Sequence, residues 1–293
     1  MVDGHTQLVG LIGWPVKHSL SPAMHNAAFD ALELNWRYVP LPVPPGEVEA
    51  AVRGLVALGF RGANVTVPHK RAVISMLDSA APNARDLGAV NTLVIERREG
   101  SSTVIKGYNT DDQGFINALQ HEGFDVGGWK SAVVVGAGGA ARAIIYSLLR
   151  SGKGEIVVLN RTLERAQALI SDLGLCPQET SRLRALPLTV ETLVESARAA
   201  GLLINATTVG MWPHVEHSIW PPDVPIPVHL TVFDLVYNPP RTRLLKQARE
   251  SRAHGISGLG MLVEQGALSF KIWTGKPAPV EVMRAVCEQA LKR

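Results

Sequence analysis

One stretch near the middle of the chain constrains the fold most strongly. Residues 131–142 read Ser-Ala-Val-Val-Val-Gly-Ala-Gly-Gly-Ala-Ala-Arg, an apolar strand that runs into a glycine turn and then into an apolar helix. In this GxGxxA spacing the first glycine permits a tight turn, the second lets a pyrophosphate approach the backbone, and the small third residue lets the helix pack on the sheet. The stretch predicts a dinucleotide site, with an ordinary strand-turn-helix as the alternative. The expected contacts are Gly136, Ala137, Gly138, Gly139 and Ala140.

The next strand predicts which dinucleotide binds. An NAD site usually carries an acidic residue at the carboxyl end of this strand, where it bonds the ribose 2′-hydroxyl. Here Glu155 stands at the opposite end of the strand, and Arg161 and Arg165 follow its carboxyl end. Two guanidinium groups four residues apart can flank a 2′-phosphate. We therefore expect NADP(H), with a solvated helix start as the alternative. The expected contacts are Asn160, Arg161, Thr162, which can also cap the following helix, and Arg165.

Short apolar runs alternate with helical patterns along the whole chain. In the first part, strands are expected at residues 8–12, 36–41 and 62–67, with helices at 22–34 and 47–58. A second series of strands is expected at 132–135, 156–159, 202–204 and 232–236, followed by helices at 260–273 and 280–291. Strands separated by helices form βαβ units. The pattern therefore predicts an α/β protein with two domains, each built on a mostly parallel sheet.

Two proline-rich stretches, residues 40–45 and 213–227, interrupt these patterns. Proline lacks the amide donor and fixes φ, so it is excluded from helix interiors and central strands. We expect both stretches to be surface loops, and the second is long enough to form a flap near a site.

Composition excludes several classes of protein. The 29 Lys and Arg residues against 26 Asp and Glu give a net charge of +3 without a basic run, which argues against a nucleic-acid face. Cys176 and Cys287 lie far apart and fit neither a disulfide scaffold nor a zinc site. Glycines and Arg142 interrupt the apolar residues 132–149, which argues against a membrane span. The first residues of the chain show no basic segment that leads into an apolar one, which argues against a secretory signal. We expect a cytoplasmic protein that binds small molecules, without a metal.

Polar residues gather at four places in the first part of the chain. Ser21 is expected to cap a helix with Pro22 at its first position, which leaves Ser19 free for a carboxylate or polyol ligand. Pro68 is expected to start another helix with Lys70 in its first turn, where a cation opposes the helix dipole and is poorly placed for a purely structural role. Asn91 stands at a third strand-loop edge, and the segment 107–112 forms the fourth, where a turn explains the polar residues as well as a site does.

Together these segments resemble the shikimate dehydrogenase family. The motifs, in the family's order between about Gly10 and Gly275, are SxSxxxHN at Ser19, NVTxPxK at Asn64, GAxNT at Gly88, GxNTD at Gly107, GAGGAxR at Gly136, NRTxxRA at Asn160, NATxxGM at Asn205, DxVYNPxxTxLL at Asp234 and GxGMLVxQGAxxFxxWTG at Gly258. The resemblance implies NADPH-dependent reduction of 3-dehydroshikimate to shikimate, on the route to chorismate and the aromatic amino acids. It also implies a discontinuous substrate-binding domain of residues 1–112 and 258–293, with a Rossmann-type NADP-binding domain of residues 113–257 inserted in it.

The resemblance also implies roles for individual residues. Lys70 and Asp111 would be the acid-base pair that protonates the alkoxide left by hydride transfer. The implied substrate contacts are Ser19, Ser21, Thr66, Lys70, Asn91, Asp111, Tyr237 and Gln265, and the added cofactor contacts are Leu235, Gly258 and Met261. A nearby carboxylate favours the charged form of a lysine, whereas proton transfer near neutral pH needs both forms. Which member of the pair transfers the proton therefore stays open.

Three alternatives remain at this stage. A quinate/shikimate dehydrogenase of broader substrate range or NAD preference is the nearest, and Arg161 argues against the NAD preference. A non-catalytic sensor that binds dinucleotide or shikimate belongs to a different class, and the presence of both Lys70 and Asp111 argues against it. A dehydrogenase that depends on His25 or His69 would need an orienting carboxylate, which the sequence does not indicate. Either a monomer or a homodimer is compatible with the sequence.

Overall fold

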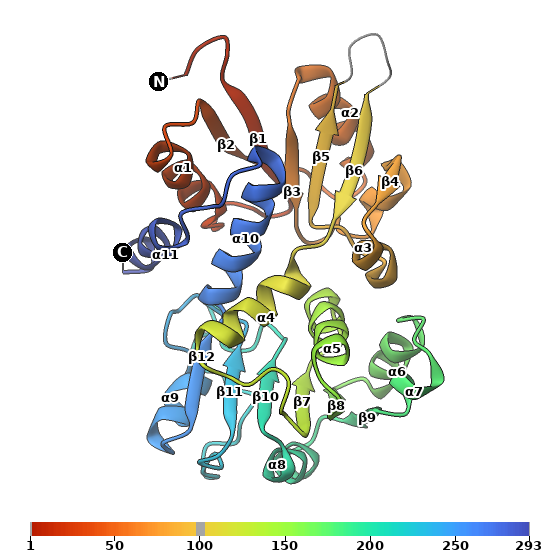
Figure 1. Cartoon of the computed structure of the whole chain (residues 1–293). Coiled ribbons are helices and arrows are strands. Elements are labelled where there is room, and N and C mark those ends of the chain that lie inside the picture. The colour runs from red at the N-terminus through yellow and green to blue at the C-terminus, as the bar shows by residue number, and fades with distance from the viewer. Residues whose placement is uncertain (1, 98–102, 293) are drawn as a thin grey trace. The chain divides into compact units, whose positions relative to one another are not determined.

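The computed structural model describes residues 2–97 and 103–292 and has an α/β fold, as the sequence predicts. Its contacts divide the chain into two compact units (Figure 1). Unit 1 comprises Met1–Gly114 and Val263–Arg293, and unit 2 comprises Phe115–Leu262. The chain passes between the units inside two helices, α4 (Asp111–His121) and α10 (Leu259–Thr274). The boundaries of the units fall a few residues beyond 112 and 257, inside α4 and α10.

Unit 1 is built on a six-stranded sheet in the order β2-β1-β3-β5-β6-β4. Its strands are β1 (Gln7–Gly13), β2 (Trp36–Pro42), β3 (Gly62–Val65), β4 (Ser79–Ala80), β5 (Thr92–Glu96) and β6 (Val104–Tyr108). Its helices are α1 (Ser21–Ala31), α2 (Val48–Leu58), the 3₁₀ helix η1 (Ala72–Met76), α3 (Pro82–Leu87) and α11 (Val280–Ala290), together with parts of α4 and α10. The pairing is parallel except at β5, which runs antiparallel to both β3 and β6.

The expectation that residues 40–45 form only a loop was wrong. Pro40 and Pro42 belong to β2, which pairs with β1 alone and is the edge strand of the sheet. An edge strand tolerates proline because one side of its backbone has no partner strand. The loop is therefore shorter than the proline content suggests.

Unit 2 is built on a six-stranded sheet that is parallel throughout. Its strands are β7 (Ser131–Val135), β8 (Glu155–Asn160), β9 (Leu183–Pro187), β10 (Leu202–Asn205), β11 (Thr231–Asp234) and β12 (His254–Ser257). Its helices are α5 (Gly139–Ser151), α6 (Leu163–Ser171), α7 (Pro177–Thr180), α8 (Val190–Ala199) and α9 (Arg243–Glu250), with the remainder of α4 and α10. Counted from β7, the spatial order is 3-2-1-4-5-6, the order of dinucleotide-binding sheets, and the strand order reverses between β7 and β10.

The second proline-rich stretch is not a free flap along its whole length. Trp220 and Ile226 are buried in the core of unit 2, beside Leu230 and Leu244. The indole nitrogen of Trp220 donates to the carbonyl oxygen of Val224 at 2.7 Å. The later part of the stretch is therefore held in place by the core. Among residues 2–97 and 103–292, no helix combines the length and the apolar character needed to cross a membrane.

Candidate active site

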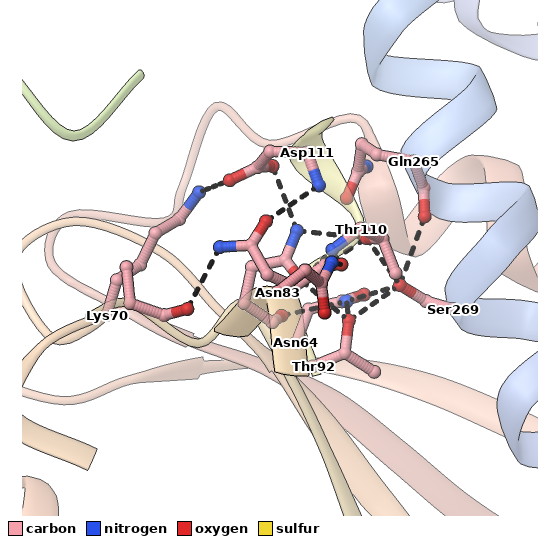
Figure 2. A network of polar contacts seen from close by, with 11 residues as sticks. Asn64, Lys70, Asn83, Thr92, Thr110, Asp111, Gln265 and Ser269 are labelled. Atoms are coloured by element: carbon pink, nitrogen blue, oxygen red, sulfur yellow. Dashed lines mark hydrogen bonds and ion pairs between the residues drawn. The ribbon is translucent and has the colours of Figure 1, made fainter. Parts of the chain in front are cut away.

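An ion pair lies at the centre of the polar residues of unit 1. The Nζ atom of Lys70 lies 2.5 Å from Oδ2 of Asp111, and both side chains are partly shielded from solvent (Figure 2). Asp111 is the first residue of α4, where the helix dipole favours a negative charge. The sequence motifs place these residues 41 positions apart, and the fold brings them together.

Lys70 does not stand in the first turn of a helix, as the sequence analysis expected. Residues 66–71 form turns, and the 3₁₀ helix η1 begins only at Ala72. The backbone carbonyl of Lys70 instead accepts a hydrogen bond from the amide of Val90 at 2.8 Å. This bond fixes the lysine against the loop that leads into β5.

The carboxylate of Asp111 is held from both sides. Its second oxygen, Oδ1, accepts a hydrogen bond from Nδ2 of Asn91 at 2.9 Å, and its backbone amide donates to Oδ1 of Asn109 at 3.0 Å. Nδ2 of Asn109 donates in turn to the carbonyl oxygen of Ala89 at 3.0 Å. Asn109 is thus a turn residue, as one of the two sequence interpretations held, and the turn positions Asp111.

A buried network that the sequence analysis did not identify supports this arrangement (Figure 2). Nδ2 of Asn64 donates to Thr92 Oγ1 and to Ser269 Oγ, each at 3.0 Å, and Oδ1 of Asn64 accepts from the Tyr38 hydroxyl at 2.9 Å. Thr110 joins the same cluster through Asn91, whose Nδ2 donates to Thr110 Oγ1 at 2.9 Å. Asn64 and Thr110 stand in quoted motifs, but nothing local in the sequence indicates that Tyr38 and Ser269 meet them.

The serines of the first motif do not have the local roles expected of them. The N-cap of α1 is Leu20, and Ser21 is already the first helical residue, with its side chain buried. The backbone amide of Ser21 donates to Oγ of Ser19 at 3.2 Å, so Ser19 supplies the capping oxygen. The reason is that the helix begins one residue earlier than the Ser-Pro pair suggests. Thr66 follows β3 and is half-buried.

Gln265 is brought beside Asp111 by a close approach of two helices. A β-carbon on Gly114, one turn after Asp111 in α4, would lie 2.8 Å from the amide nitrogen of Gln265 in α10. A β-carbon on the next residue, Gly266, would collide with Met24 of α1. Two glycines therefore allow α10 to pack against α4 and α1, the helices that carry Asp111 and Ser21.

The structure argues against a catalytic histidine. His25 is fully buried and stacks on Tyr38 with ring centroids 4.5 Å apart, and neither ring nitrogen has a hydrogen-bond partner in the described part of the chain. Burial lowers the pKa of His25 to about 3. His69 is also buried, and its Nε2 lies 2.7 Å from the carbonyl oxygen of Val43. Neither ring forms an ion pair with a carboxylate of the described residues, and both are buried as core residues.

In unit 2, the glycine turn has the conformation that its sequence predicts. Gly136 ends β7 with φ +119°, and a β-carbon there would lie 2.9 Å from the carbonyl oxygen of Ala206, which follows β10. A β-carbon on Gly138 or Gly139 would meet nothing within 4 Å, so space is open above the start of α5. The first amides of a helix have no partner within it and attract anions. Ala141 is fully buried, which lets α5 pack on the sheet.

The carboxyl end of β8 presents two exposed guanidinium groups. Arg161 and Arg165 are exposed, and among residues 2–97 and 103–292 neither side chain has an ion-pair or hydrogen-bond partner. Nδ2 of Asn160 donates to the carbonyl oxygen of Thr162 at 2.8 Å, which shapes the turn between them. Thr162 occupies the N-cap position of α6, but its side chain makes no capping bond. The residues present thus fit a nucleotide with a 2′-phosphate.

A buried network at the carboxyl ends of β10 and β11 explains two more motifs. Asn205 donates to Oδ1 of Asp234 at 2.9 Å, and Oδ2 of Asp234 accepts from the Thr242 hydroxyl at 2.6 Å. Burial raises the pKa of Asp234 to about 6. These bonds shape the loops that carry the half-buried Tyr237 and Leu235. Gly258 packs so closely on Leu235 that a β-carbon would collide with its carbonyl, and Met261 is buried in α10.

The fold and these sites define a dinucleotide-dependent α/β oxidoreductase with a lysine-aspartate pair. Three family models match: the shikimate dehydrogenase substrate binding domain over residues 11–93, shikimate/quinate 5-dehydrogenase over 119–220, and the shikimate 5′-dehydrogenase C-terminal domain over 258–288. The chain belongs to the shikimate dehydrogenase family.

Individual relatives agree with this assignment. The chain is 49% identical to the shikimate dehydrogenase (NADP⁺) of Methanopyrus kandleri over 99% of this chain and 98% of that protein. The crystal structure of the Thermus thermophilus enzyme with NADP(H) and shikimate has a TM-score of 0.84 and 37% identity, over 98% of this chain and 100% of that one. Quinate dehydrogenase from Corynebacterium glutamicum, solved with NAD, has a TM-score of 0.86 and 30% identity, over 97% of this chain and 99% of that one.

Proposed function

We propose that this chain catalyses the reversible NADPH-dependent reduction of 3-dehydroshikimate to shikimate, in the biosynthesis of chorismate and the aromatic amino acids. The observation that carries the proposal is the Lys70–Asp111 ion pair, held by Asn91 in a member of this family. Relatives that span nearly the whole chain are named for this reaction and for NADP.

The geometry supports Lys70 as the proton donor. Both oxygens of Asp111 already accept hydrogen bonds, one from Lys70 and one from Asn91. A lysine ammonium has three N–H groups, and one of those of Lys70 is directed at Asp111. The others are available for the carbonyl oxygen of the substrate, which takes a proton as the hydride reaches the carbon. Asp111 then orients the lysine and a neighbouring substrate hydroxyl, and in the reverse direction Lys70 accepts the proton.

The proposed substrate contacts follow from the same residues. The hydroxyls of Ser19 and Ser21 stand at the start of α1, where a carboxylate is favoured by the helix dipole. The implied set is completed by Thr66, Asn91, Gln265 and Tyr237.

The cofactor would be held in unit 2. The amides at the start of α5 suit its pyrophosphate, and Arg161 and Arg165 suit its 2′-phosphate. Leu235, Gly258 and Met261 are the proposed contacts of its nicotinamide end. When bound, NADPH supplies the hydride. We assign substrate binding to unit 1 and NADP binding to unit 2, and we expect a cytoplasmic monomer or homodimer.

Replacing Lys70 with Ala tests the proposed role. We expect kcat to fall by about 10²-fold or more, the usual scale of general acid-base catalysis, with KM nearly unchanged. Lys106→Ala is a matched control, because Lys106 also pairs with a carboxylate in unit 1, Glu96 at 2.8 Å, but on β6 outside the site. A large rise in KM at unchanged kcat would show that Lys70 only binds the substrate.

A further inference from the structure

Positive charge is concentrated around α9 of unit 2, on basic side chains that the proposed function does not use. Residues 241–254 contain five Lys or Arg residues and one Glu, a net charge of +4, whereas the whole chain carries +3. The rest of the chain therefore sums to −1. Because α9 buries Leu244, Gln247 and Ala248 in the core, its basic side chains face outward.

Four of these basic residues line one groove. The groove has a volume of about 760 Å³ and lies between α9 and the edge strand β12. Its lining includes Leu245 and Gly255, and a β-carbon on Gly255 would lie only 3.2 Å from Leu245, which shows how closely α9 packs there. The basic lining residues are Arg241, Lys246, Arg249 and Arg252, with His254 beside them. None of the residues found to line the groove is acidic.

Structural roles account for only part of this charge. Arg249 lies in the last turn of α9, where a cation stabilises the helix dipole. Arg241 precedes the helix, and Lys246 stands in its first half, where the dipole gives no such benefit. Within the described part of the chain, none of the four side chains has an ion-pair or hydrogen-bond partner. Like charges three residues apart on a helix, such as Lys246 and Arg249, repel each other. An anion in the groove would remove that repulsion.

We propose that this groove binds a small organic anion that carries two or more phosphate groups. The four cations suit oligophosphate oxygens, and the apolar lining residues Leu245 and Ala253 suit an organic moiety. The volume is that of a small-molecule site, and the cations form one cluster rather than the extended stripe that a nucleic acid would follow. Four strand spacings of about 4.8 Å, roughly 19 Å in total, separate β12 from β8. The groove is therefore separate from Arg161, which follows β8.

Isothermal titration of inorganic pyrophosphate into the protein saturated with NADP⁺ tests the proposal, because the cofactor then fills its own phosphate site. We expect one further binding event, weakened by added salt. The double variant Lys246→Ala/Arg249→Ala should weaken it about tenfold or more through the loss of two charged contacts. Arg198→Ala is the matched control, because Arg198 is exposed in the last turn of α8 in the same unit and should change binding less than about twofold.

Several results would overturn the proposal. These are no binding of pyrophosphate to the NADP⁺-saturated protein, an equal loss in the Arg198 variant, or tighter binding of a short oligonucleotide than of pyrophosphate. Circular dichroism checks that the variants fold. If the double variant does not, Arg241→Ala removes a cation from the loop before α9 and must also weaken binding.

Discussion

Replacing both Arg161 and Arg165 with Gln should remove the preference for NADP⁺ without impairing the chemistry. Hydrogen bonds to a charged group contribute about 1.5–3 kcal/mol each when buried, and solvent exposure reduces this to about 0.5–1 kcal/mol. Both guanidinium groups are exposed and without a partner in the described part of the chain. Their loss should therefore cost about 1–2 kcal/mol of NADP⁺ binding and raise its KM roughly 5- to 30-fold. Because no internal contact is broken, stability should change little.

Initial rates with saturating shikimate, followed by absorbance of the reduced nicotinamide, measure this effect. NAD⁺ lacks the 2′-phosphate, so its KM should stay within about twofold, and kcat should stay constant with both cofactors. Arg198→Gln controls for the loss of a positive charge elsewhere in unit 2. An equal rise in KM for NAD⁺, or an unchanged KM for NADP⁺, would refute the assignment of these arginines to the 2′-phosphate.

Three further substitutions test the packing and the buried networks. Gly114→Ala should destabilise the protein by about 1–3 kcal/mol and raise the KM for shikimate, since the added β-carbon would overlap the backbone of Gln265; an unchanged melting temperature would contradict the close approach. Tyr38→Phe should lower the free energy of unfolding in urea by about 1–2 kcal/mol, because Oδ1 of the buried Asn64 loses this donor. An unchanged free energy of unfolding would contradict that bond. The wild type should lose stability as the pH rises from about 4 to 6, because the Asp234 carboxyl keeps its proton to about pH 6 in the folded state but releases it near 3.8 when unfolded. Asp234→Asn should remove this pH dependence, which amounts to up to about 3 kcal/mol in the free energy of unfolding. Unfolding curves at pH 4 and pH 7 measure it, and an unchanged difference between the two would contradict the raised pKa.

The nucleotide unit was predictable because its signal is local. The run from Ser131 to Arg142 contains the strand, the turn and the start of the helix. The conformation of each of these segments is determined by residue types within the run. The strand order was not predictable from this run, since the pairing of β9 and β12 depends on strands that are distant in the sequence. Local pattern therefore predicts the site, and tertiary packing determines the sheet.

The lysine-aspartate site was predictable only through the family motifs. Lys70 was expected in a helix but lies in a turn, where its carbonyl oxygen accepts a hydrogen bond from the amide of Val90. The local sequence pattern does not indicate this long-range bond. Tyr38 and Ser269 were missed for a similar reason. Each is an ordinary residue of a strand or a helix, and only the packing of α10 on the sheet brings Ser269 to Asn64, 205 positions away in sequence.

The most direct test of the central claim is the oxidation of shikimate by the purified wild-type protein with NADP⁺, measured as absorbance of the reduced nicotinamide. We expect turnover with shikimate and NADP⁺ at a kcat/KM well above that with NAD⁺ or with quinate. No signal with either cofactor would contradict the enzyme assignment. A preference for NAD⁺ or quinate would assign the chain to the quinate-oxidising side of the family.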